Sequence, residues 1–265
     1  MDLSQVKMVV SDMDGTLLNS KHEVSTRFFE LFEELKSRDI LFVAASGRQY
    51  DSIIHKLAPI KNEILVIAEN GALVKEKEKE LLVTPIQRNL KSSLLSRIEN
   101  IDGAHAMLCG KYNAYLDGNS VPFLEQLKEY YASYEIHDDF SLVTDEIIKI
   151  AVYHNISAEE HIYPAMKDLE NQIKVKVSGL NWVDLNHTDA NKGFALEKLQ
   201  MRFGISPEET MVFGDYNNDL EMLGKAKFSF AMENAHPNVI EVANYQTTNN
   251  DDFGVERVLE KLLTN

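Results

Sequence analysis

The sequence has few of the residues that build disulfides, metal clusters of thiolates or membrane spans. Cys109 is the only cysteine, which excludes an intrachain disulfide and a zinc site made of cysteines. No apolar run approaches the roughly 18 residues that a membrane-spanning helix needs. The first residues carry Asp2 and lack the charged-then-apolar pattern of a secretory signal. We therefore expect a protein of a reducing compartment, the cytoplasm.

Positive charge is also scarce. The 265 residues include 27 Lys and Arg against 42 Asp and Glu, a formal net charge of −15. This balance argues against nucleic acid and anionic membranes as partners, because both recruit clustered basic residues. A small anionic ligand remains compatible, since local charge can oppose net charge. The hydrophobic fraction of 44% is that of a folded protein, and the length suits one large or two modest domains.

The two ends of the chain alternate strand and helix patterns. Short apolar runs at 6–11, 40–45 and 64–68 predict buried strands, and helical spacing at 25–38 and 49–57 separates them. This order predicts an α/β fold with a doubly wound, Rossmann-like parallel sheet. A hairpin is expected at 73–83. The alternation returns later, with helices expected at 191–202, 217–224, 237–243 and 252–263 and strands at 210–213 and 227–231.

The middle of the chain has a different pattern, in which helices are followed by paired strands. Helices are expected at 88–100, 122–134 and 158–170, and strands at 105–109, 112–116, 147–154, 173–177 and 182–185. We therefore predict a discontinuous core domain of residues 1–85 and 187–265, with residues 86–186 inserted as an α+β cap domain. Insertion at an exposed loop is well tolerated by a folded core.

Reactive side chains gather where predicted strands end, which is where ligands bind in doubly wound sheets. Asp12 and Asp14 leave the first strand together, and Gly15 allows a sharp turn or a close approach. Paired carboxylates suit Mg²⁺, which shares its coordination between protein oxygens, phosphate and water. Taken alone, a solvated Asp-Gly turn explains the segment equally well.

Two predicted helices carry a cation at their positive end. Ser46 is a suitable N-cap for the helix at 49–57, which places Arg48 near its first turn. Thr188 or Asp189 is the expected cap of the next such helix, with Lys192 in its first turn. The helix dipole opposes a cation there by roughly 0.3–1 kcal/mol, and a bound anion reverses that preference. Arg48 alone is more simply an arginine pointing into solvent, but two such helices together suggest that Arg48 and Lys192 converge on an anion.

A further acidic segment follows the strand at 210–213. Asn217 or Asn218 is expected to cap the helix at 217–224, with Asp219 in its first turn. A well-capped helix explains Asp219 fully but Asp215 only in part. Three acidic groups and two cations at strand ends together describe a metal-assisted phosphoryl site. The sequence contains neither a Walker A loop nor the G-x-G-x-x-G or G-x-S-x-G motifs, so nucleotide-loop and serine-nucleophile alternatives lack support.

These segments, taken in order, resemble the haloacid-dehalogenase-like phosphatase superfamily, and within it the Cof-type subfamily with a large inserted cap. The matching motifs are Asp12-Met13-Asp14-Gly15-Thr16-Leu17, Ala45-Ser46-Gly47-Arg48, Asn70-Gly71-Ala72, Lys192-Gly193 and Gly214-Asp215 through Asn218-Asp219. Asn234-Ala235 and Phe253-Gly254-Val255 resemble its C-terminal markers. Three positions depart from the pattern, because Tyr216 and Glu233 stand where Gly is common and Asn244 where Asp is common.

The resemblance implies a role for each matched residue. Asp12 would attack phosphorus and form an aspartyl-phosphate, while Asp14 would protonate the leaving oxygen and then activate water. Mg²⁺ would be held by the side chains of Asp12 and Asp215 and by Asp14 through its backbone carbonyl, with Asp219 either a further ligand or a residue that contacts the ligands. Phosphate would be bound by Ser46, Lys192 and Asn218, together with the backbone N–H groups of Met13 and Gly47. Arg48 and Asn70 would face the substrate.

The activity so implied is a Mg²⁺-dependent phosphatase of small phosphomonoesters, such as sugar phosphates or related metabolites. A phosphomutase or phosphotransferase passes through the same aspartyl-phosphate, so the motifs do not separate these reactions. A phospho-accepting module like a receiver domain fits less well, because such modules are about half this length and lack a cap. In the cap, residues that could contact the leaving group are His105, Tyr112, His154, Asn181 and Trp182. For most of them, packing or simple exposure is the commoner explanation.

Overall fold

The computed structural model describes residues 2–117, 134–137 and 139–264. The chain divides into two compact units, and each is described by itself. The core unit comprises Met1–Leu82 and Asn191–Asn265, and the inserted unit comprises Val83–Ala190. Compared with the expected domain limits, the connecting residues on both sides belong to the inserted unit. Among the residues described, no helix has the length and apolar character of a membrane span.

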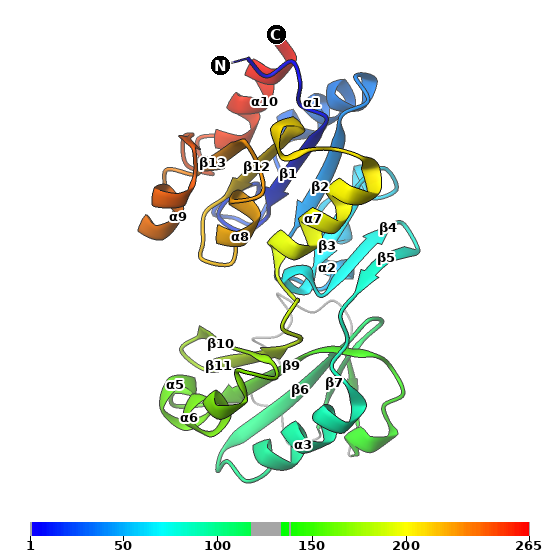
Figure 1. Cartoon of the computed structure of the whole chain (residues 1–265), viewed down its shortest axis with the longest axis vertical. Coiled ribbons are helices and arrows are strands. Elements are labelled where there is room, and N and C mark those ends of the chain that lie inside the picture. Colours follow the sequence, from blue (N-terminus) through cyan, green and yellow to red (C-terminus); the bar gives the residue numbers. More distant parts are fainter. Residues whose placement is uncertain (1, 118–133, 138, 265) are drawn as a thin grey trace. The chain divides into compact units, whose positions relative to one another are not determined.

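The core unit is built on one sheet of eight strands in the order β14-β13-β12-β1-β2-β3-β4-β5 (Figure 1). The strands are β1 Met8–Asp12, β2 Leu41–Ala45, β3 Leu65–Ala68, β4 Leu73–Glu76, β5 Lys79–Val83, β12 Thr210–Gly214, β13 Phe228–Ala231 and β14 Tyr245–Gln246. Pairing is parallel from β14 through β3, and β4 returns antiparallel to β3. The expected parallel sheet and its terminal hairpin are confirmed, while β14 was not expected.

Helices cover both faces of this sheet. They are α1 Thr26–Ser37, α2 Tyr50–Lys56, α7 Lys192–Phe203, α8 Leu220–Leu223, α9 Pro237–Val242 and α10 Gly254–Thr264. On one face, Leu196 and Leu199 of α7 pack with buried strand residues such as Val10 and Val212. On the other, Phe28 of α1 meets Phe42 of β2, with ring centroids 5.0 Å apart. The core is therefore doubly wound.

The inserted unit contains a six-stranded sheet in the order β10-β11-β9-β6-β7-β8. Its strands are β6 Ala104–Gly110, β7 Ala114–Leu116, β8 Tyr134–Ile136, β9 Ile147–His154, β10 Lys174–Gly179 and β11 Trp182–Asn186. Its helices include α3 Arg88–Ile98, α5 Ala158–His161 and α6 Tyr163–Met166. Among the strands of this unit that the structure describes, all pairings are antiparallel except that of β7 with β8. This mixture of helices with a largely antiparallel sheet is the expected α+β architecture.

Of the helices expected in the inserted unit, one is replaced by shorter elements and another lies almost wholly outside the described residues. The single helix expected at 158–170 is wrong, because the structure has α5, α6 and a 3₁₀ turn at Lys167–Leu169 in its place. Pro164 lies at the start of α6, where it has no N–H to continue the hydrogen bonding of α5. The helix expected at 122–134 lies outside the described residues, apart from Tyr134, which begins β8.

Candidate active site

The neighbouring parallel strands β12, β1 and β2 of the core sheet have their carboxyl ends at the same edge. Asp12 is the last residue of β1 and pairs with Ala45, the last residue of β2. On the other side, Ser11 pairs with Phe213, so that Asp215 follows β12 at the same edge. Parallel strands have all their carboxyl ends on one side of a sheet, and ligands bind there in this class of fold. The register therefore brings Asp12, Ser46 and Asp215 to a single edge.

Lys192 is the first residue of helix α7, and its side chain reaches this edge. The N-cap of α7 is Asn191, whose side-chain oxygen accepts a hydrogen bond from the Phe194 N–H at 2.7 Å. The caps expected at Thr188 and Asp189 are therefore wrong. The Lys192 side chain is completely buried, and its ammonium group donates to Oδ1 of Asp12 and, at 2.7 Å, to Oδ1 of Asp219. As expected, Lys192 lies in the first turn of the helix, and two carboxylates compensate its charge.

The acidic segment after β12 folds back on itself. Oδ2 of Asp219 accepts from the backbone N–H groups of Asp215 and Tyr216, at 3.0 and 3.1 Å. Helix α8 begins only at Leu220. The longer helix, its capping by Asn217 or Asn218 and the placement of Asp219 in its first turn are thus wrong. Asp219 instead orders the loop that carries Asp215.

The turn after Asp14 approaches Asp215 closely. Thr16 Oγ1 donates to Oδ1 of Asp215 at 3.2 Å. Gly15 has a φ of +76°, and a Cβ at this position would lie 2.3 Å from Oδ2 of Asp215. Only glycine combines that backbone conformation with that approach. Thr16 contacts this carboxylate although its side chain was not among the expected site residues.

Two buried carboxylates and one partly buried carboxylate fit a divalent cation. Asp12, Asp215 and Asp219 each offer an oxygen, and these oxygens lie within 4.8 Å of one another. Three carboxylates and the ammonium group of Lys192 leave a formal charge of −2 in a buried site. Hard oxygen donors with this charge suit Mg²⁺. Asp12, Asp215 and Asp219 are thus a candidate ligand set.

The pKa shifts show that burial disfavours the ionised carboxylates. Burial raises the pKa of Asp12 well above its ordinary value, although the charge and hydrogen bond of Lys192 act to lower it, and the neighbouring carboxylates of Asp219 and Asp215 add to the rise. Burial and the charge of Asp219 also raise the pKa of Asp215 to about 6. Burial disfavours the charged form of Lys192, but its two carboxylate partners more than offset this and raise its pKa. A bound cation would favour the ionised carboxylates.

Arg48 is buried and forms a two-pronged ion pair with Asp14. Its Nε and Nη2 each lie 2.7 Å from a different oxygen of that carboxylate. Burial alone would raise the pKa of Asp14, but the hydrogen bonds and charge of Arg48 lower it below its ordinary value. Helix α2 begins at Tyr50 without a side-chain cap, so the expected cap at Ser46 and the place of Arg48 in the first turn are wrong. Ser46 Oγ instead accepts from the Arg48 N–H at 3.1 Å.

Two asparagines lie beside these residues. Nδ2 of Asn218 donates to Oδ1 of Asn70 at 2.9 Å, and the Asn70 N–H donates to the Ser46 carbonyl at 2.9 Å. A Cβ on Gly47 would lie 3.1 Å from the Asn70 amide group. Asn70 itself has a φ of 54°, which asparagine tolerates better than most residues. Among the expected phosphate-binding residues, Met13 has a fully buried side chain, so only its backbone is suited to bind phosphate.

Two further residues, Asn234 and His22, contact the first motif. Nδ2 of Asn234 donates to the Gly15 carbonyl at 2.8 Å, and Oδ1 of Asn234 accepts from the Asn250 N–H at 3.2 Å. His22 Nδ1 lies 3.4 Å from Oδ1 of Asp14. The marker Asn234-Ala235 pointed to the first of these residues without giving it a role. No sequence pattern pointed to His22.

In the inserted unit, packing accounts for several of the residues considered for substrate contact. The His154 ring is buried, with Nε2 3.1 Å from the Asp102 carbonyl, and Asn181 donates to the His154 carbonyl at 2.7 Å. The Trp182 ring lies against Tyr153 with centroids 5.0 Å apart. The remaining two are partly exposed His105 and largely exposed Tyr112.

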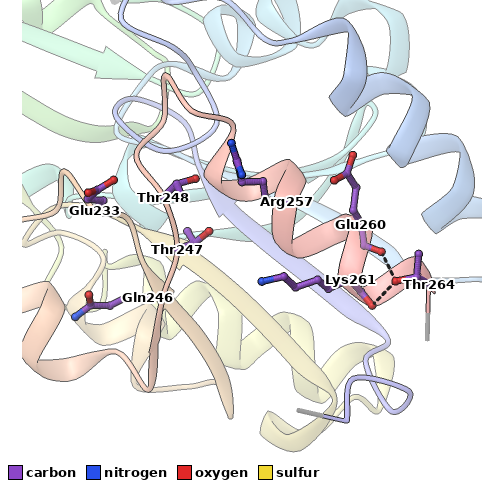
Figure 2. Close-up of a pocket in the computed structure, with 8 residues that line it drawn as sticks. All are labelled: Glu233, Gln246, Thr247, Thr248, Arg257, Glu260, Lys261 and Thr264. Carbon is purple, nitrogen blue, oxygen red and sulfur yellow. Dashed lines mark hydrogen bonds between the residues drawn. The ribbon is translucent and has the colours of Figure 1, made fainter.

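A separate groove runs along α10 (Figure 2). Its volume is about 660 Å³, and it is lined by Glu233, Gln246, Thr247, Thr248, Arg257, Glu260, Lys261 and Thr264. Charges of both signs line it, and Glu260 also accepts from Arg27 Nε at 3.0 Å. This mixed lining gives no preference for an anion, so the strand-end cluster is the better candidate for phosphate chemistry.

Comparisons with known proteins agree with this geometry. The family of haloacid dehalogenase-like hydrolases matches residues 9–259. A 5-amino-6-(5-phospho-D-ribitylamino)uracil phosphatase of Escherichia coli K12, YbjI, is 33% identical over 97% of this chain and 96% of its own length. An HMP-PP phosphatase of Escherichia fergusonii is 27% identical over 87% and 85%. A solved Streptococcus mutans structure aligns with a TM-score of 0.88 and 32% identity over 98% of this chain and 100% of that one.

A doubly wound core with buried carboxylates at its strand ends and an inserted α+β unit defines a class of hydrolases. The chain belongs to the haloacid dehalogenase-like hydrolases. Within that family it is a phosphatase of the Cof type.

Proposed function

We propose that this phosphatase hydrolyses small phosphomonoesters, such as sugar phosphates or related metabolites, with Mg²⁺ and through an aspartyl-phosphate. The observation that carries the proposal is the buried Asp12 carboxylate, which is bound by Lys192 and lies with Asp215 and Asp219 at the edge where ligands bind. The name of the Escherichia coli relative gives a small phosphorylated metabolite as its substrate, which supports the same class here. The net charge of −15 favours such a ligand over nucleic acid.

In the first step, a carboxylate oxygen of Asp12 forms a bond to phosphorus while the bond from phosphorus to the leaving oxygen breaks. The carboxyl group of Asp14 gives its proton to that leaving oxygen. In the second step, water attacks the phosphorus of the aspartyl-phosphate and gives a proton to Asp14. The bond from phosphorus to Asp12 then breaks, and free phosphate leaves.

The negative charge on the transferred phosphoryl group would be stabilised by residues at the sheet edge. Lys192, Ser46, Asn218 and the backbone N–H groups of Met13 and Gly47 would bind its oxygens. Mg²⁺ would be held by Asp12, Asp215, Asp219 and the Asp14 carbonyl, and when bound it neutralises carboxylate and phosphate charge. Arg48 and Asn70 would contact the substrate, which requires Arg48 to release at least one oxygen of Asp14.

The decisive test replaces the proposed nucleophile. Asp12→Asn keeps the shape of the side chain but removes the attacking charge, so turnover of p-nitrophenyl phosphate with Mg²⁺ should fall by about 10³-fold or more. Asp51→Asn is the matched control, since Asp51 is an exposed aspartate on α2, and its turnover should equal wild type. Undiminished turnover by Asp12→Asn would exclude Asp12 as the nucleophile.

Product analysis separates the alternative reactions. Hydrolysis releases free phosphate in step with the alcohol. An isomerised sugar phosphate without free phosphate would indicate a phosphomutase instead. A stable phosphoprotein without turnover would indicate a phospho-accepting module.

A further inference from the structure

The carboxylate of Asp14 has two basic neighbours with different surroundings. Arg48 is buried and binds both of its oxygens at 2.7 Å. His22 approaches Oδ1 alone, with Nδ1 at 3.4 Å, and half of its side chain is exposed. The acid role proposed for Asp14 needs one oxygen directed at the leaving group. Arg48 in its present position occupies both.

The backbone at His22 is held in an unfavourable conformation. Its φ is 57°, in the left-handed region, which costs a residue other than glycine roughly 1–2 kcal/mol. Asn19 builds the turn, because its side-chain oxygen accepts from the Lys21 and Glu23 N–H groups at 2.9 and 3.0 Å. Lys56 Nζ donates to the His22 carbonyl at 2.9 Å. The surrounding chain thus fixes the imidazole beside Asp14 at some conformational cost.

We propose that His22 is a positioning residue for Asp14. It holds Oδ1, so that Oδ2 is directed at the leaving oxygen once Arg48 turns to the substrate. The proton that passes to the leaving group comes from Asp14 and returns to it from water in the second step, so His22 adds no proton to the balance. This inference rests on the proposed function, because it assumes that Asp14 is the general acid.

The leaving group provides the test. An alkoxide is a poor leaving group and needs the proton from Asp14, whereas p-nitrophenolate leaves without it. A misplaced acid therefore slows alkyl phosphates selectively, while a general loss of structure slows both kinds. The probes are p-nitrophenyl phosphate and the alkyl phosphate that the wild type turns over fastest in a panel of sugar and glycerol phosphates.

The chosen variant is His22→Asn, because asparagine tolerates the left-handed backbone and lacks the imidazole. We expect kcat/KM for the alkyl phosphate to fall by about tenfold, mostly in kcat, and that for p-nitrophenyl phosphate by less than about twofold. The matched control is Asp39→Asn, since Asp39 also has a positive φ, of 56°, but precedes β2 at the opposite end of that strand from Ser46. It should leave both values unchanged.

Asp14→Asn separates a failure of this inference from a failure of the proposed function. A selective loss on the alkyl phosphate by both Asp14→Asn and His22→Asn supports both. A selective loss by Asp14→Asn, with equal losses or none for His22→Asn, overturns the role of His22 and keeps that of Asp14. An equal loss on both substrates by Asp14→Asn removes the acid role of Asp14 and, with it, the role of His22.

Discussion

Titratable side chains are buried in both units, and the partners of Lys192 and Arg48 differ in kind from those of His154. In the core unit, Lys192 binds Asp12 and Asp219 across 180 and 27 residues of sequence, and Arg48 binds Asp14 across 34. In the inserted unit, the buried ring of His154 is satisfied by backbone, with Nε2 near the Asp102 carbonyl and Nδ1 accepting from the Ile156 and Ser157 N–H groups.

This difference distinguishes residues of a functional site from residues that only support the fold. Burying charges against one another costs desolvation energy, and apolar residues of similar volume would often be as stable or more so. A polar side chain that completes backbone hydrogen bonds is explained by the fold alone. Buried charges paired with other charges at a sheet edge are therefore the stronger sign of chemistry, and the following predictions test that distinction.

The largest effect on activity is expected at Lys192, because its charge is completely buried and paired with carboxylates. Lys192→Met keeps much of the volume but leaves the carboxylates of Asp12 and Asp219 without their ammonium partner. The kcat for p-nitrophenyl phosphate should fall by about 10²–10³-fold, and the Mg²⁺-free protein should lose about 3–5 kcal/mol of stability. Steady-state kinetics and urea unfolding in EDTA measure the two losses.

Lys198→Met is the matched control on the same helix. Lys198 is exposed and lies over the Phe194 ring, with Nζ 4.8 Å from its centroid, so its stability change should stay within about 0.5 kcal/mol. If both variants lose stability equally while kcat is kept, the buried lysine is part of the scaffold.

An intermediate effect is expected at Asn234, an uncharged residue that links the site to its support. Asn234→Ala removes the hydrogen bond to the Gly15 carbonyl, and this glycine lies against Asp215. We expect kcat to fall by about tenfold and the Mg²⁺ concentration for half-maximal activity to rise, because a slightly misplaced site loses much of its rate. Activity measured over a Mg²⁺ titration provides both values.

The control for Asn234 is Asn244→Ala. Asn244 also donates from Nδ2 to a backbone carbonyl, that of Lys227, at 3.0 Å. It should lower the melting temperature as much as Asn234→Ala does, without changing the Mg²⁺ titration. Identical titrations for the two variants would reduce Asn234 to a structural residue.

The effect on activity is expected to be smallest at His154, in the inserted unit. His154→Ala removes a buried ring and its bonds to backbone, so stability should fall by about 1–3 kcal/mol. The kcat for p-nitrophenyl phosphate should stay within about threefold of wild type, since the ring is explained by packing. A large loss of kcat at unchanged stability would show that a buried side chain bonded only to backbone can also take part in catalysis. The distinction between the two kinds of buried side chain would then be wrong.

The sequence predicted the elements of the site better than their contacts. Apolar runs and polar strand ends identified β1, β2 and β12 and brought Asp12, Ser46 and Asp215 to one edge. Local rules misjudged the helix starts, because Asn191 rather than Thr188 or Asp189 faces the free N–H groups of α7.

The contacts of Arg48 and Asp219 could not be predicted from neighbouring residues. From the sequence, Arg48 is expected in the first turn of its own helix, opposed by the helix dipole. In the structure it binds Asp14, which follows a neighbouring strand. Asp219 was interpreted as a residue of the first helical turn, whereas it is bound to the loop before it and to Lys192. Long-range pairings depend on the sheet register, which no single segment encodes.

One buried carboxyl group of the core unit lies outside the site. Glu256 of α10 is buried, and one of its oxygens accepts from Ser25 Oγ at 2.6 Å, the same hydroxyl that caps α1. Burial raises the pKa of Glu256 above its ordinary value of 4.5. Between pH 4.5 and the raised pKa, the folded state binds more protons than the unfolded state. The free energy of unfolding therefore falls as pH rises through this range and is constant above it.

Glu256→Gln keeps the hydrogen-bond acceptor for Ser25 and removes the charge. Its stability relative to wild type should therefore grow as pH rises from about 4 to about 7, by an amount on the order of 1 kcal/mol, with no change in kcat. Urea midpoints of both proteins across this pH range measure the difference. Parallel curves would mean that Glu256 ionises in the folded state as easily as in the unfolded chain. A growing difference would show that a buried charge in the core unit is costly when no partner of opposite charge compensates it, as Lys192 does for Asp12.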